Sequence, residues 1–151
     1  MPYIALIIYL SLALTLQLLT GDFPVHFFAF PLNVILAALW FGGMFYLWKH
    51  KRKSRPISFF LSSGATSSSI ISFVVFCLVV GVTGMRNLVN TWVFVAFLLY
   101  FQTVLLFVIF RGWRRLRFFL NHAGLLLAIS SAFWGAPDTE ELRLRAFRDV
   151  P

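Results

Sequence analysis

The sequence predicts an all-α integral membrane protein with about five transmembrane helices. Its composition is the first reason: 60% of the 151 residues are hydrophobic and 12% are charged, whereas a soluble domain has about 45–50% apolar and about 25% charged residues. The apolar residues also form long runs, and a helix of about 20 such residues crosses a bilayer core of about 30 Å. These runs show no alternation of apolar and polar residues, which excludes the strands of a membrane barrel.

Five apolar runs are long enough to cross a membrane, and none contains Asp, Glu, Lys or Arg. Their expected bounds are 3–19, 28–48, 57–82, 91–110 and 118–135, which together make a membrane domain over residues 1–136. The first run lacks the basic start and the small-residue cleavage site of a signal peptide, so we expect it to be retained. The second run contains Pro31 in its first turn, where proline is tolerated because its missing N–H has no helical partner there.

The third run, 57–82, is unusually polar in its first half, where small and hydroxyl residues occupy 62–69. Small side chains let helix backbones approach closely, and their hydroxyls bond back to the helix or across to a neighbour. We therefore favour a helix-packing surface here over a polar cavity. Cys77, the single cysteine, cannot form an intrachain disulfide and is expected to be a small buried hydrophobe.

The distribution of charge predicts the orientation. Nine of the thirteen lysines and arginines lie in two loops, 49–55 and 111–117, which the positive-inside rule assigns to the cytoplasm. The five acids fall on the opposite side: Asp22, Asp138, Glu140, Glu141 and Asp149. The N-terminus is then cytoplasmic, and residues 137–151 form an extracytoplasmic tail. Topology and contact with anionic lipid of the bilayer account for the net charge of +8 better than nucleic acid does.

Few residues could carry out chemistry. No helix interior contains an ionisable carboxylate, lysine or arginine, which argues against a proton pump or an ion-coupled transporter. The chain also lacks a zinc-protease motif and a glycine-rich phosphate loop. An enzymatic activity of this chain alone is therefore not expected, although a role within an enzymatic complex stays open.

Three histidines remain as candidate ligands. His50 lies in a basic loop and is expected to be solvated, whereas His26 lies among aromatic residues at the outer interface and could be an external ligand. His122 falls about one turn inside the cytoplasmic end of the fifth run. Neutral imidazole is a good axial ligand for haem iron, but an imidazole bonded to a neighbouring carbonyl is an equally ordinary arrangement. The spacing alone leaves both readings of His122 open.

The helical positions around His122 predict two faces on the fifth helix. At 100° per residue, one face is a ridge of small residues: Gly124, Ala128, Ser131 and Gly135. The opposite face carries His122 and three bulky residues: Leu126, Ile129 and Phe133. We expect the small ridge to pack against a neighbouring helix. The bulky residues would then offer an apolar wall for a haem next to the imidazole.

The stretch FFLNHAGLLLAI at 118–129, followed by GAPDTEELRL at 135–144, resembles the ResB/CcsB family of system II cytochrome c biogenesis. The segment FPLNVILAALW at 30–40 and the basic loop after it resemble family variants with extra N-terminal helices. Members of this family continue into a large extracytoplasmic domain and a final membrane helix. Residues 137–151 would then be the beginning of that domain, or the chain would be a short relative of the family.

The resemblance implies a function. A histidine at the position of His122 is regarded in this family as an axial ligand for haem that travels outward across the bacterial inner (cytoplasmic) membrane. The implied partners are a CcsA/ResC-type membrane protein and apocytochrome c, which receives the haem. The chain has no tryptophan-rich motif, so the ligation chemistry would belong to the partner.

Two other functions fit the residues. A small accessory subunit of a membrane complex, without a haem role, is the main alternative, because the small-residue faces of the third and fifth helices suit helix partners. A small-molecule permease is weaker, since such proteins are commonly built from internal repeats and no convincing repeat relates the helix pairs.

Overall fold

The structure of the chain is a computed structural model that describes residues 2–84 and 90–138, within which all regular secondary structure is helical. In chain order the elements are α1 (Pro2–Thr20), η1 (Val25–Phe28), α2 (Leu32–Lys51), α3 (Arg55–Phe60), α4 (Ser63–Thr83), α5 (Trp92–Gly112), α6 (Leu116–Gly135) and η3 (Ala136–Asp138). The predicted all-α class is confirmed. The residues that follow Asp138, including Glu140, Glu141, Asp149 and most of the predicted tail, lie outside the described part of the chain.

Among the described residues, four helices are long and apolar enough to cross a membrane: α2, α4, α5 and α6. The apolar stretch of α1 is shorter and covers Leu6–Thr20. The structure thus indicates a multi-pass membrane protein. The fifth crossing, by α1, stays a prediction.

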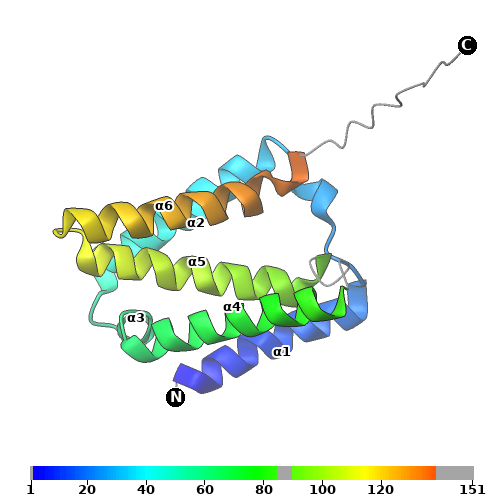
Figure 1. Ribbon diagram of the computed structural model, residues 1–151, viewed down its shortest axis with the longest axis horizontal. Coiled ribbons are helices and arrows are strands. Elements are labelled where there is room, and N and C mark those ends of the chain that lie inside the picture. The colour runs from blue at the N-terminus through cyan, green and yellow to red at the C-terminus, as the bar shows by residue number, and fades with distance from the viewer. Residues whose placement is uncertain (1, 85–89, 139–151) are drawn as a thin grey trace, which may run out of the picture.

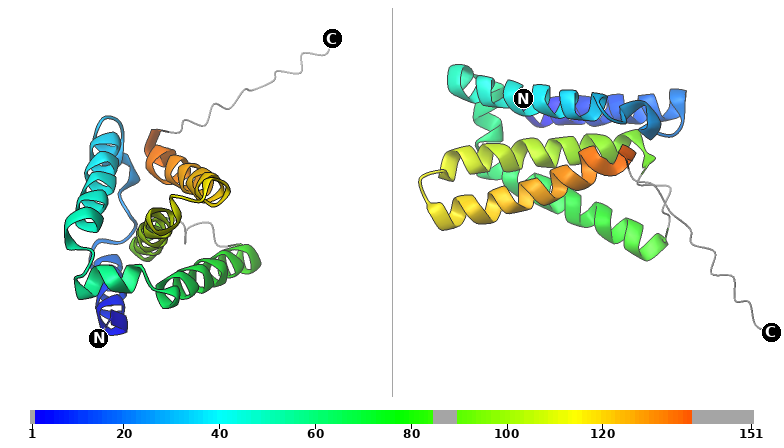
Figure 2. Two further views of the ribbon diagram at one scale, coloured as in Figure 1. Left: turned by 90° about the vertical axis from the view of Figure 1, so that its left-hand side faces the viewer. Right: turned by 90° about the horizontal axis from the view of Figure 1, so that it is seen from above.

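The bundle is organised around α5. Viewed along the helices, α5 lies in the middle, with α1, α4 and α6 around it (Figure 2). In the most apolar stretch of α5, 67% of the residues are buried inside the protein. The buried share of the corresponding stretch is 11% in α4, 6% in α2 and zero in α6. The outer helices therefore expose most of their surface, as expected for helices surrounded by lipid.

Two apolar clusters attach the outer helices to α5. On one face Tyr100, Val104 and Val108 pack with the fully buried Ala65 of α4. On another face Phe101, Leu105 and Ile109 pack against one residue of α4 and three of α6. These are Phe73, Ala123, Leu126 and Ile129.

Hydrogen bonds hold the start of α5. The hydroxyl of its N-cap residue, Thr91, accepts from the backbone N–H of Phe94 at 3.2 Å. The side-chain carbonyl of Gln17, in α1, accepts from the N–H of Trp92 at 2.7 Å. A neighbouring helix therefore helps to satisfy the first turn of α5, whose N–H groups have no partner within the helix itself.

The predicted third helix, 57–82, is two helices in the structure. α3 ends at Phe60 and α4 begins at Ser63, with Leu61 and Ser62 between them. The Ser62 hydroxyl accepts from the N–H of Ala65 at 3.2 Å, so that this serine acts as the N-cap of a new helix. That local bond competes with continuation of the helix, and α3 is too short to cross a membrane.

The predicted packing surface at the start of α4 is present. Ala65 and Ser69, one turn apart, are both buried against the bundle. The hydroxyls of Ser68 and Tyr100 lie 2.9 Å apart in a hydrogen bond that joins α4 to α5. The small and hydroxyl residues therefore serve close helix packing.

The two faces predicted for α6 are present, but their roles are exchanged. The small residues Gly124, Ala128 and Ser131 are exposed, and a Cβ added at Gly124 would meet nothing within 4 Å. Instead the bulky Leu126 and Ile129 pack on α5. The prediction that the small ridge packs against a neighbouring helix of this chain is wrong. Large side chains from both α5 and α6 fill the interface between these helices instead.

The two basic loops meet at one end of the bundle, and the described acids lie at the other (Figure 1). At the basic end, the guanidinium of Arg111 donates to the carbonyl oxygen of Leu61 at 3.0 Å. At the acidic end, the Asp138 carboxylate accepts from the N–H of Phe30 at 2.8 Å. This arrangement agrees with the charge asymmetry on which the predicted orientation depends. The assignment of the basic end to the cytoplasm stays a prediction.

Candidate functional site

His122 lies in the second turn of α6, near the basic end of the bundle, and is half-buried. Its Nδ1 lies 2.8 Å from the carbonyl oxygen of Phe118, and its ring stacks on the Phe118 ring at a centroid distance of 3.9 Å. A carbonyl oxygen can only accept, so Nδ1 carries the hydrogen. In the neutral imidazole the lone pair is then on Nε2.

This geometry unites the two readings that the sequence left open. The imidazole bonds to a neighbouring carbonyl, and in doing so it adopts one tautomer and one ring orientation. Histidines that bind metals usually donate their other ring N–H to a carbonyl or a carboxylate in this way. The arrangement of His122 is therefore compatible with a ligand whose coordinating atom is Nε2.

The surroundings of His122 fit a haem only in part. The apolar wall expected from Leu126 and Ile129 is occupied by their packing on α5. Among the described residues, no group of three or more His, Cys, Asp or Glu side chains could hold a metal ion. His122 is therefore a lone candidate ligand among the described residues of this site, and a haem here would need further contacts from a second protein.

His26 does not join this site. It lies in η1, is exposed, and belongs to the acidic end of the bundle, whereas His122 lies near the basic end. The structure thus leaves the two candidate histidines at opposite ends of the bundle. His50, at the end of α2, places its Nδ1 3.1 Å from the carbonyl oxygen of Tyr46 and is exposed, as its basic loop predicted.

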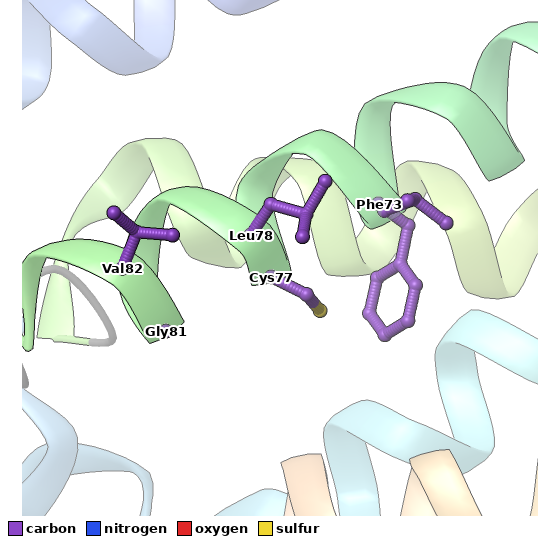
Figure 3. A pocket seen from close by; sticks show the side chains of 6 residues that line it. Phe73, Cys77, Leu78, Gly81 and Val82 are labelled. Carbon is purple, nitrogen blue, oxygen red and sulfur yellow. The ribbon is translucent and has the colours of Figure 1, made fainter.

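Cys77 is exposed, contrary to the prediction that it is buried. It lies in a shallow apolar groove on the surface of α4, lined by Phe73, Val74, Cys77, Leu78, Gly81 and Val82 (Figure 3). The thiol was expected inside the protein because its run is apolar. In a membrane protein an apolar run faces lipid as readily as it faces protein.

A polar network at the acidic end was not predicted. Asn33 is 3% exposed, and its amide donates to the Trp134 carbonyl at 2.9 Å and to the Asp138 carboxylate at 2.6 Å. With the bond from the N–H of Phe30 to Asp138, these contacts join the start of α2 to the end of α6. The signal in the sequence was an asparagine in the first turn of an apolar helix.

Gln102 was also missed. This residue lies in the middle of α5 and is fully buried; its side-chain oxygen accepts from Nε1 of Trp134 at 3.3 Å. Its Nε2 has no hydrogen-bond partner among the described residues. The sequence reasoning considered only charged groups inside the helices, whereas an uncharged amide in mid-helix also signals a contact between helices.

Comparisons of the chain with protein-family models, with curated proteins and with solved structures gave no match. The resemblance of residues 30–40, 118–129 and 135–144 to the ResB/CcsB family therefore stays a prediction.

Proposed function

We propose that this chain is a component of the bacterial inner membrane that binds haem and relays it to apocytochrome c, together with a CcsA/ResC-type partner. His122 would be an axial ligand of the haem iron through Nε2. The observation that supports this role is the bond between Nδ1 of His122 and the Phe118 carbonyl at 2.8 Å. It holds the imidazole in the tautomer that ligation requires.

In this proposal each residue of the chain has a limited task. The Phe118 carbonyl orients the imidazole and leaves the lone pair of the neutral ring on Nε2. The Phe118 ring stacks on the imidazole and restricts its rotation. Bound haem would supply the reactive vinyl groups, and their attachment to the cytochrome thiols would be the work of the partner.

The second protein would contact α6 on its exposed ridge of small residues, on the face opposite to His122. Gly124, Ala128 and Ser131 are exposed there and allow close approach of another helix. With the basic end in the cytoplasm, His122 would lie near the surface from which haem is exported. The position of the histidine along α6 is thus consistent with a first binding step rather than a final one.

Haem spectra of the purified full chain test this proposal, recorded with and without co-expressed partner. We expect His122→Ala to lose most of the bound haem, or to shift its absorption bands, because the iron loses a strong-field nitrogen ligand. His26→Ala and His50→Ala are matched controls that should leave haem content and spectra unchanged. Equal haem content and identical spectra in His122→Ala and the wild type would refute the ligand role.

An accessory subunit without a haem role is the second candidate, and the exposed ridge on α6 favours it independently of His122. Native gels of solubilised membranes distinguish the two functions. A stable complex that contains the chain, lacks haem and is lost in Gly124→Leu would support the accessory role. A complex that carries haem and depends on His122 would exclude it.

A further inference from the structure

The turn between α5 and α6 borders an open surface cavity of about 380 Å³. Its lining residues are Arg111, Gly112, Trp113, Arg114, Arg115 and Phe118. The N–H of Arg115 donates to the carbonyl of Gly112 at 2.9 Å and closes the turn. A Cβ added at Gly112 would overlap the Phe118 ring, so this glycine allows the ring to lie directly under the turn. Three arginines and two aromatic residues thus line the cavity.

Within residues 2–84 and 90–138, no acid lies near the positive charge of this cavity. The two described acids, Asp22 and Asp138, lie at the other end of the bundle, and the one hydrogen bond described for the Arg111 guanidinium goes to a neutral carbonyl. The first turn of α6 contains no acid and begins beside Arg115. Cations at a helix N-terminus are unfavourable, because the helix dipole is positive there. An anion in the cavity would offset both effects.

The depth of the cavity identifies the class of anion. The cavity lies at the end of α5, from Arg111 onward, directly after the apolar run 91–110. Trp113, 60% exposed, lies beside it with the Arg114 guanidinium 5.9 Å from its ring. Tryptophan and arginine next to a membrane helix are typical of the headgroup region. The anions concentrated at that level are lipid phosphates, which guanidinium groups bind through two parallel hydrogen bonds.

We propose that this cavity is a binding site for the phosphate of an anionic phospholipid, with Arg114 and Arg115 as its principal ligands. The site is independent of the haem function. It differs from a general attraction of positive charge to the membrane, because it assigns the binding to one turn rather than to both basic loops.

Native mass spectrometry of the full chain in neutral detergent tests the site, by titration with phosphatidylglycerol and, separately, phosphatidylcholine. We expect one phosphatidylglycerol to bind at least about tenfold more tightly than phosphatidylcholine, and Arg114→Gln/Arg115→Gln to weaken it about tenfold or more. The matched control is Lys51→Gln/Lys53→Gln, which removes the same charge from the other loop and should change the affinity by less than about threefold.

Three results would overturn the proposal. Equal losses in the two double variants would mean diffuse attraction, and equal binding of the two lipids would mean no headgroup site. Displacement of the lipid by equimolar inorganic phosphate would assign the cavity to a free anion. If the double variant does not fold, Arg114→Gln alone serves, with a smaller loss expected. Arg114→Lys/Arg115→Lys keeps the charge but lacks the planar guanidinium, so it should bind phosphatidylglycerol with intermediate affinity.

Discussion

The imidazole Nδ1 of His122 lies 2.8 Å from the carbonyl oxygen of Phe118, one helical turn earlier in α6. Because this bond is made within one helix, it does not depend on the packing of α6 against its neighbours. The orientation of the histidine is thus a local property of α6. It would persist in any complex in which the outer face of that helix is covered.

Free imidazole should restore haem binding to His122→Gly. The substitution removes the proposed ligand and leaves a space of about its size, and a dissolved imidazole can occupy such a space and bind the iron. We expect the wild-type spectrum to return at millimolar imidazole. His26→Gly is the control and should not respond. A His122→Gly spectrum that imidazole leaves unchanged contradicts the axial role.

Gly112→Ala should destabilise the chain by about 1–3 kcal/mol, the range for overpacking. Its Cβ would overlap the Phe118 ring, which must then move away from the turn and from His122. Unfolding in mixed micelles, followed by circular dichroism, measures the effect.

Gly124→Ala is the matched control for Gly112→Ala, since a Cβ at Gly124 meets nothing within 4 Å. It should be neutral or stabilising by less than about 1 kcal/mol, because alanine favours the helix. Equal destabilisation by the two alanines would contradict the close contact at Gly112.

Asp138→Asn should weaken the junction of α2 and α6. An amide at position 138 has one oxygen that accepts and one NH₂ group that donates. The NH₂ group would face either the N–H of Phe30 or the amide of Asn33, and both of these are donors. A buried donor such as Asn33 that loses its acceptor costs about 1–3 kcal/mol. The same unfolding assay measures the loss. Asp22→Asn removes an equal charge at the same end and should change stability by less than about 0.5 kcal/mol.

Thiol labelling tests the predicted orientation. In a Cys77→Ser background, an impermeant maleimide applied to intact spheroplasts should label Asp22→Cys and not Ser54→Cys. Ser54 lies in a basic loop expected in the cytoplasm, and Asp22 lies at the opposite end of the bundle. Labelling of Ser54→Cys alone would invert the topology.

The positions of the helices could be predicted because length and apolarity are the properties that a bilayer selects. The expected runs 91–110 and 118–135 differ from α5 and α6 by at most two residues at each end. The break at Leu61 and Ser62 could not be found in this way. It depends on one serine side chain that caps α4, and serine occurs as readily inside membrane helices as at their ends.

The packing of α6 was mispredicted for a different reason. In water an apolar face indicates the core, but in lipid both faces of a helix are apolar and the distinction disappears. Leu126 faces α5 while Leu127 is 69% exposed, and composition does not separate them. The tautomer of His122 likewise depends on its hydrogen bond to the Phe118 carbonyl. Helical spacing suggests such a bond only as one of two possibilities, the other being a ligand role.

The central place of α5 has a consequence for the synthesis of the protein. The ribosome completes α1 and α4 before α5. About ninety residues separate the end of α1 from the end of α5, and their translation takes about 5–20 s. During that interval the Tyr9 hydroxyl lacks its acceptor, the carbonyl of Ala96, and the buried face of α4 lacks the helix that covers it. Until α5 is made, the early helices therefore lack most of the contacts that join them in the folded protein.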